Sequence, residues 1–140
     1  MALSGVGGTA LIGATGRSPG GAAFVFHRDT EGVWRQTKVL RGSDGDGYDR
    51  FGQSVALSRT GTIALAGAPS AHFDSSGEAY AFEEIDGSWS DSENIVGGDS
   101  ENLDSFGWSV SLSRIGRKAL VGAYGHDGGL GAAYVFVALG

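Results

Sequence analysis

The stretch FGQSVALSRTGTIALAGAP, from Phe51 to Pro69, decides the fold because the chain repeats it. A second copy, FGWSVSLSRIGRKALVGA, begins at Phe106, and a clipped third copy opens the chain, where TALIGA ends at Ala14. Repetition at a fixed spacing is typical of proteins in which each copy forms the same supersecondary unit. We therefore expect three successive units of one kind.

Each unit continues with a loop and a further apolar strand, which reads GAAFVF, GEAYAF and GAAYVF in the three units. The segments VWRQTKVLRG and SWSDSENIVGG follow the first two copies, with Trp34 and Trp89 at equivalent positions, where we expect them to pack. The first of these segments alternates polar and apolar residues, as an outermost, water-exposed strand does. The predicted repeats are 1–50, 51–105 and 106–140. Four strands fit in the middle repeat, and incomplete sets of strands fit on either side of it.

The composition favours a single all-β domain. Of the 140 residues, 41% are hydrophobic, and 26 glycines accompany only 2 prolines, as in proteins built of many short strands and tight turns. No segment shows the periodicity of an amphipathic helix.

Charge and composition also exclude several classes of function. The net charge of −6, with no extended cluster of Lys and Arg, disfavours nucleic-acid binding. The absence of cysteine excludes disulfides, thiol nucleophiles and cysteine metal sites. No apolar run approaches the roughly 18 residues of a membrane-spanning helix, and the N-terminus lacks the pattern of a signal peptide.

The motifs FG, SVALS and GAP, followed by a strand of small and aromatic residues, resemble the FG-GAP repeat of integrin α-subunit heads and of many secreted microbial proteins. The resemblance covers the whole chain. It implies a β-propeller of four-stranded antiparallel blades, with about two and a half to three blades in this chain. It also implies an extracellular or cell-surface module that binds a protein or glycan and mediates adhesion, and not an enzyme.

Candidate ligand-binding residues lie at one end of the units. In an up-and-down meander, the loop between the second and third strands emerges at the same end as the link to the next unit. These loops differ in length between repeats, and recognition concentrates in loops held by a rigid scaffold. The candidates are Arg17, His72, Phe73, Asp74, Trp108, His126 and Asp127.

Each of these candidates also has a purely structural interpretation. Trp108 replaces Gln53 of the preceding repeat, and this unrepeated aromatic residue fits either specific recognition or packing. The histidines do not recur at one repeat position, and solvated loop residues explain them equally well.

The links between units carry acids at matched positions, which suggests a possible Ca²⁺ site. Oxygen ligands from a flexible loop suit this cation. The matched residues are Asp44, Asp46 and Asp49 in the first link and Asp99, Glu101 and Asp104 in the second. Calcium-binding members of the FG-GAP family carry their acidic run just ahead of the GAP strand, where this chain has SRTGT and SRIGR. The alternative is that these side chains cap turn amides in the links.

A hydrolase that uses loop His and Asp residues around a metal ion is the catalytic alternative. The sequence contains no HExxH, phosphate-binding or dinucleotide-binding motif. We therefore expect a non-catalytic binding or scaffold module with no cofactor other than a possible Ca²⁺.

The incomplete terminal units predict self-association. Closed propellers need about four to eight blades, and open blade faces drive association. Head-to-tail pairing of two chains gives a closed ring of six blades, or of five if the partial units merge into one. We expect a homodimer before a trimer, and either before a segment completed by another protein.

Overall fold

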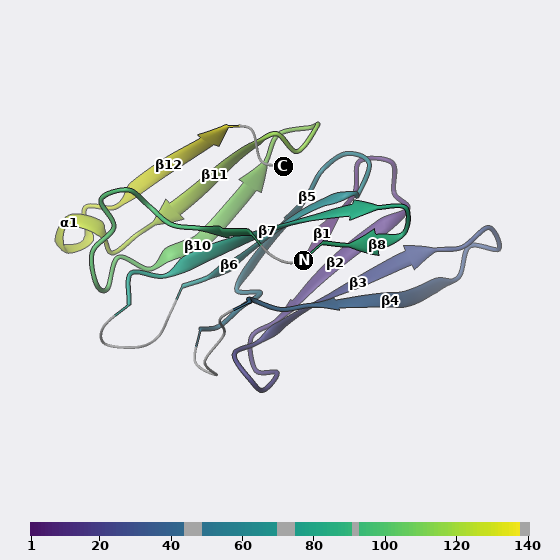
Figure 1. Cartoon of the computed structure of the whole chain (residues 1–140), viewed down its shortest axis with the longest axis horizontal. Helices are drawn as coiled ribbons and strands as arrows, with labels where there is room; N and C mark the ends of the chain where they lie inside the picture. The colour runs from purple at the N-terminus through teal and green to yellow at the C-terminus, as the bar shows by residue number, and fades with distance from the viewer. Residues whose placement is uncertain (44–48, 70–74, 91–92, 138–140) are drawn as a thin grey trace.

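The computed structural model describes residues 1–43, 49–69, 75–90 and 93–137, which form three antiparallel sheets (Figure 1). The sheets follow one another in chain order, and the middle sheet lies between the other two. The one helix in this part of the chain, α1 (His126–Gly129), is a single tight turn with Asp127 and Gly128 in left-handed conformations. It is too short to cross a membrane. The all-β prediction is therefore confirmed.

Strand order follows the chain in the first and third sheets, and in the middle sheet the last two strands both pair with the third, so each sheet is an up-and-down meander. The first sheet contains β1 (Ala2–Leu3), β2 (Thr9–Ala14), β3 (Ala22–Arg28) and β4 (Trp34–Leu40). The middle sheet contains β5 (Ser54–Leu57), β6 (Ile63–Ala68), β7 (Glu78–Ile85), β8 (Ser88–Trp89) and β9 (Glu93–Ile95). The third sheet contains β10 (Phe106–Leu112), β11 (Lys118–Ala123) and β12 (Ala132–Val137).

The first sheet has one strand more than its three full-length segments predict. The two residues of β1 pair with β2 in the register that β5 keeps with β6, because Ala2 lies opposite Leu11 as Ala56 lies opposite Leu65. Even this clipped first strand therefore completes a four-stranded sheet.

The outermost strands of the first and middle sheets differ. As predicted, β4 is exposed along most of its length. Its counterpart in the middle sheet is split into β8 and β9, which pair with opposite ends of β7. The sequence SDSEN stands there in place of RQTKV and contains no β-branched residue, so it favours a continuous strand less strongly.

Glycines bring neighbouring sheets into backbone contact. A Cβ atom on Gly13 of β2 would lie 1.9 Å from the carbonyl oxygen of Gly52, and a Cβ on Gly67 of β6 would lie 1.9 Å from that of Gly107. Both Gly52 and Gly107 have a positive φ, which glycine adopts without strain. The glycines of the FG and GA motifs are therefore the points at which one sheet docks on the next.

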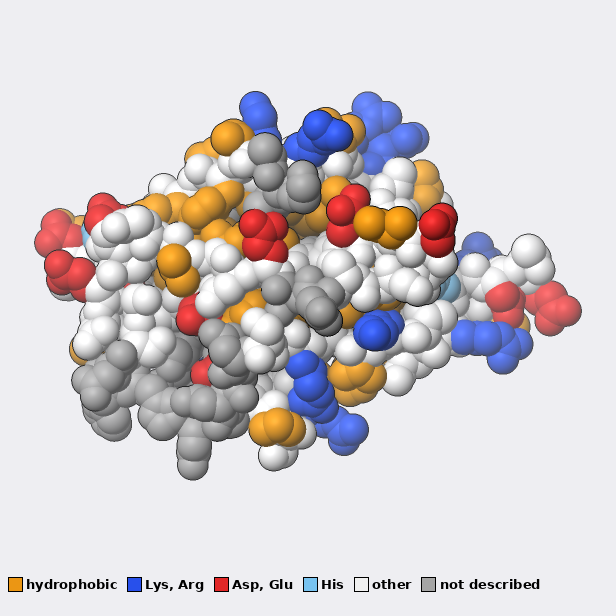
Figure 2. Space-filling model, viewed as in Figure 1, with side chains coloured by type: hydrophobic (Ala, Val, Ile, Leu, Met, Phe, Trp, Pro, Cys, Tyr) orange, Lys and Arg blue, Asp and Glu red, His pale blue; other side chains and the backbone are white. Residues whose placement is uncertain are grey.

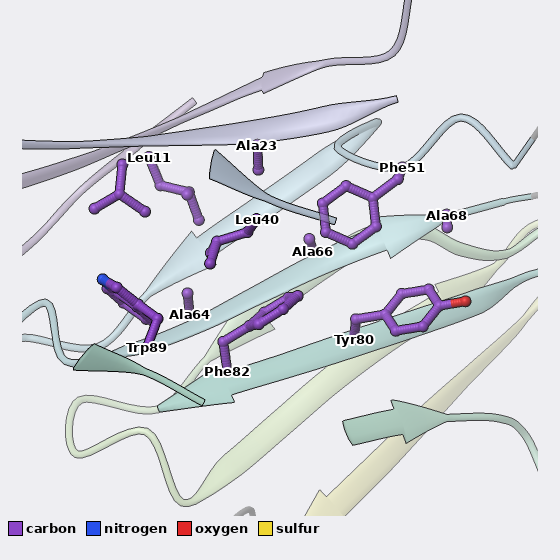
Figure 3. Close-up of a cluster of buried hydrophobic side chains, with 11 residues drawn as sticks. Leu11, Ala23, Leu40, Phe51, Ala64, Ala66, Ala68, Tyr80, Phe82 and Trp89 are labelled. Carbon is purple, nitrogen blue, oxygen red and sulfur yellow. The ribbon is translucent and has the colours of Figure 1, made fainter. Parts of the chain in front are cut away.

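A hydrophobic cluster fills the junction between the first and middle sheets (Figure 3). The first sheet presents aliphatic and small side chains, and the middle sheet presents aromatic side chains beside alanines. Facing one another are Leu11, Ala23 and Leu40 on one side and Tyr80, Phe82 and Trp89 on the other. The Phe51 ring inserts between the sheets, with its centroid 5.5 Å from that of Tyr80 and 6.0 Å from that of Phe82.

The junction between the middle and third sheets repeats this arrangement. The Phe106 ring lies 5.3 Å from Tyr134 and 6.0 Å from Phe136, opposite the aliphatic and small residues of the middle sheet. That opposite set is Leu65, Ala79, Ala81 and Ile95. At both junctions, the aliphatic face of one sheet thus packs on the aromatic face of the next sheet. Burying each large side chain at such a junction stabilises the fold by about 1.5–3 kcal/mol.

Candidate binding face

The variable loops and the links between sheets lie at the same end of the molecule, as the topology predicted. At the start of β3, Ala23 pairs with Leu40 at the end of β4. The Arg41 guanidinium donates hydrogen bonds to the carbonyl oxygens of Pro19, at 3.1 Å, and Gly21, at 2.9 Å, which ties the first link to the first loop. We call this end the loop face. Its described residues are 15–21, 41–43, 49–50, 75–77, 96–105 and 124–131.

A buried carboxylate anchors the loop face of the third sheet. Asp104 Oδ2 lies 2.7 Å from His126 Nδ1 and accepts a hydrogen bond of 2.8 Å from the backbone N–H of Glu101. The Gly125 N–H donates to the Asp104 carbonyl oxygen at 3.0 Å. The Tyr134 hydroxyl lies 3.5 Å from the same His126 nitrogen. These contacts fasten the third loop to the second link.

The two members of this pair shift one another's titration. Burial alone would raise the pKa of Asp104, but the hydrogen bonds from His126 and Glu101 hold this pKa below its ordinary value. The hydrogen bond to Asp104 raises the pKa of His126 above its ordinary value despite burial, and the charges of Asp99 and Asp127 add to this effect. The pair is therefore ionised over a wider pH range than its isolated groups would be.

The predicted calcium ligands of the second link do not converge on one point. Asp104 is buried and bonded within the link, whereas Asp99 and Glu101 are exposed. In the first link, Asp49 is half-buried, and Asp44 and Asp46 lie outside the described residues. No three His, Asp or Glu side chains among the residues that the structure describes lie close enough together to hold a metal ion. The geometry of Asp104 supports the turn-capping interpretation for this residue.

The unrepeated aromatic residue, Trp108, is exposed on β10 beside the loop face. Its ring centroid lies 4.8 Å from that of Tyr124 in an edge-to-face arrangement, and its side chain is 40% exposed. Sequence reasoning missed Tyr124, which is also exposed. The available signal was that Thr15 and Pro69 stand at the equivalent loop starts, so that Tyr124 is a second unrepeated aromatic residue.

Two of the remaining candidates, Arg17 and Asp127, are among the described residues. The Arg17 guanidinium carbon lies 5.8 Å from the ring centroid of Phe24, on the aromatic face of the first sheet. Asp127 is exposed beside His126 and has a positive φ. His72, Phe73 and Asp74 lie outside the described residues.

Two shallow depressions beside Trp89 were not predicted. They lie between β4 and β8, and their lining includes Lys38. His27 Nε2 spans this gap to a Glu84 carboxylate oxygen 3.7 Å away.

The comparisons with known proteins agree with this architecture. The model of the FG-GAP repeat matches residues 34–82 and 89–136, so each match runs from one outermost strand to the third strand of the next sheet. No curated protein matches the chain. Since the two matches together cover more than half of its residues, the chain belongs to the FG-GAP repeat family.

Proposed function

We propose that the chain is a non-catalytic β-propeller module for binding or adhesion, which recognises a protein or glycan ligand through its loop face. The observation that carries this proposal is the exposed Trp108–Tyr124 pair. Trp108 lies on β10, and Tyr124 begins the loop that the contact between Asp104 and His126 fastens. FG-GAP repeats are typical of extracellular and cell-surface proteins, so we expect this chain to act there.

The aromatic pair has the chemistry of a recognition site. Trp and Tyr supply large, rigid contact surfaces with a polar edge and are enriched among residues that dominate binding energy. The exposed carboxylates of Asp99, Glu101 and Asp127 lie on the same loop face. Around the aromatic pair, these charges favour a neutral or cationic ligand over an anionic one. The exposed arginines of the loop face, Arg17, Arg41 and Arg50, belong to the first loop and the first link.

Protein and glycan arrays probed with the purified chain test this assignment. We expect Trp108→Ala to weaken the detected interaction by at least about tenfold, which corresponds to about 1.4 kcal/mol. Ile85→Ala, an exposed aliphatic position at the opposite end of β7, is the matched control and leaves binding unchanged. If replacing all three variable loops leaves every detected interaction intact, the loop face is not the binding site.

Calcium-dependent adhesion is the second candidate function, because exposed acids of the second link lie on the loop face. Extracellular calcium modules bind with dissociation constants of about 10⁻⁴–10⁻³ M. On this alternative, millimolar Ca²⁺ raises the melting temperature, and Asp99→Asn reduces the rise. A chain whose melting temperature and calorimetric signal both ignore millimolar Ca²⁺ has turn-capping acids only.

The proposal includes self-assembly into a closed ring. Closed propellers contain about four to eight blades, and the described residues of one chain supply three sheets. Two chains arranged head to tail give six sheets, which makes a dimer the favoured assembly. Light scattering that reports a stable monomer at micromolar concentration would contradict this part of the proposal.

A further inference from the structure

Among the residues that the structure describes, the first and third sheets each have one face on which no other sheet packs. A leucine occupies the same position in all three repeats, on the aliphatic face of its sheet. Leu11 and Leu65 are both 0% exposed because the next sheet covers them, whereas Leu120 of β11 is 47% exposed. The third sheet therefore keeps the residue that packs on the next sheet at the internal junctions, and in the described part of the chain no sheet packs on it.

Other positions of this face show the same contrast. Val25 and Ala81 are buried at the internal junctions, but the equivalent Val135 of β12 is 68% exposed. A Cβ atom on Gly67 would meet the backbone of the next sheet, whereas one on Gly122 would meet only Ser109 of its own sheet. Figure 2 shows hydrophobic side chains exposed over the region of β10 to β12.

The aromatic face of the first sheet is uncovered in the same way. Trp34 of β4 is 41% exposed, whereas the equivalent Trp89 is 9% exposed beneath the first sheet. Ile12 of β2 is also exposed, although its counterparts Ala66 and Val121 are buried. The Arg17 guanidinium lies over one side of the neighbouring Phe24 ring.

The two uncovered faces are therefore of opposite kinds. Both internal junctions pack an aliphatic face on an aromatic face, and none of the described contacts packs two faces of one kind. One chain has one unpaired face of each kind, so a second copy presents the complement to both. Like-to-like pairing would oppose two aromatic or two aliphatic faces, a contact that neither junction uses.

We propose that the aliphatic face of the third sheet binds the aromatic face of the first sheet of a second copy, in the geometry of the internal junctions. This inference rests on the self-assembly proposed above and specifies its partner and contact surfaces. In this join, Leu120 and Val135 of one copy lie against Ile12 and Trp34 of the other. The contact is head to tail, and it closes into a ring instead of extending into a filament.

The join between copies is weaker than the internal junctions. At the internal junctions, Phe51 and Phe106 insert between the sheets, with Gly52 and Gly107 in backbone contact. Neither Phe-Gly pair of this sequence lies at the proposed join. We therefore expect the assembly to dissociate on dilution.

Two single-face variants test the inference. Trp34→Glu blocks the aromatic face, and Val135→Glu blocks the aliphatic face. Both residues are exposed on strands at sheet edges, so folding should survive, and circular dichroism checks this. Ile85→Glu, on the middle sheet, is the control with comparable exposure. Molar masses are measured by sedimentation at a concentration at which the unmodified chain is assembled.

We expect each single-face variant to be monomeric and the control to behave as the unmodified chain. An equimolar mixture of the two variants should form a one-to-one pair, because each then supplies the intact face that the other lacks. If the unmodified chain is monomeric, self-assembly and this inference fail together. If it assembles but a single-face variant remains assembled, or the mixture stays monomeric, the head-to-tail contact alone is overturned.

Discussion

Trp34 and Trp89 hold equivalent positions in the outermost strands of two sheets, yet one is exposed and the other is buried. The difference does not lie in their own sheets, because both project from the aromatic face of an outermost strand. It lies in whether another sheet covers that face, and only Trp89 has the aliphatic face of the first sheet against it. The repeated sequence therefore determines whether a face is aliphatic or aromatic in every copy, whereas the burial of that face depends on whether another sheet packs on it.

The largest expected effect comes from removing each indole in turn. We expect Trp89→Ala to destabilise the chain by about 3–5 kcal/mol, because it opens a cavity in the junction between two sheets. In the dilute chain, Trp34→Ala should cost less than about 1 kcal/mol, since this ring is partly exposed. Urea denaturation measures both. Equal losses would mean that the two faces do not differ in packing.

Gly67 and Gly122 allow the same comparison between a covered and an uncovered face, with a smaller expected effect. Gly67→Ala should cost about 3 kcal/mol because its methyl group would overlap the backbone of Gly107 in the next sheet. The closest neighbour of the added methyl group in Gly122→Ala is the Ser109 hydroxyl of the same sheet, which can rotate away, so this substitution should cost less than about 1 kcal/mol. Thermal melts of the two variants decide the point, and a reversed order would show that the sheets do not dock as described.

The smallest effect concerns the ion pair of Asp104 and His126, which fastens the third loop to the second link. The stability that this pair contributes depends on pH. His126 has a raised pKa, so its contribution is fully present below its ordinary value of 6.5 and is lost as pH rises through the raised one. Asp104 has a lowered pKa, so its contribution is present above 3.8 and is lost as pH falls through the lowered one. Stabilisation by the pair is therefore greatest between these two ordinary values.

Melting temperatures of the unmodified chain and of His126→Gln, measured from acid to alkaline pH, test this dependence. The difference between the two melting temperatures should be largest at mildly acidic pH and should decrease at lower and at higher pH. Asp127→Asn, which changes an exposed neighbour, should show little difference. A His126→Gln difference that is constant with pH would mean that the ion pair contributes no stability.

The repeat pattern predicted most of the fold. The positions of the three sheets, the meander and the shared end of loops and links all follow from the spacing of the FG and GA motifs and from strand reversal. The split between β8 and β9 did not follow, because a polar sequence such as SDSEN weakens a strand without showing where it breaks.

The candidate site was predicted less well than the fold. Asp104 and His126 were both placed on the loop face, but as a metal ligand and a ligand-binding residue. Their mutual hydrogen bond depends on how the second link packs against the third loop, and local sequence does not fix that packing. Trp34 was expected to pack like Trp89, and this was wrong for the single chain because the repeat alone does not specify a neighbour.

Oxidative footprinting of the three tryptophans by mass spectrometry measures whether a second copy covers the aromatic face of the first sheet. Their exposures in one chain are 41% for Trp34, 9% for Trp89 and 40% for Trp108. We expect Trp89 to be protected and Trp108 to be labelled at every concentration. Trp34 should be labelled in the dilute chain and protected when the chain is concentrated. If Trp34 is labelled as strongly in the concentrated sample as in the dilute one, no second copy covers the aromatic face of the first sheet.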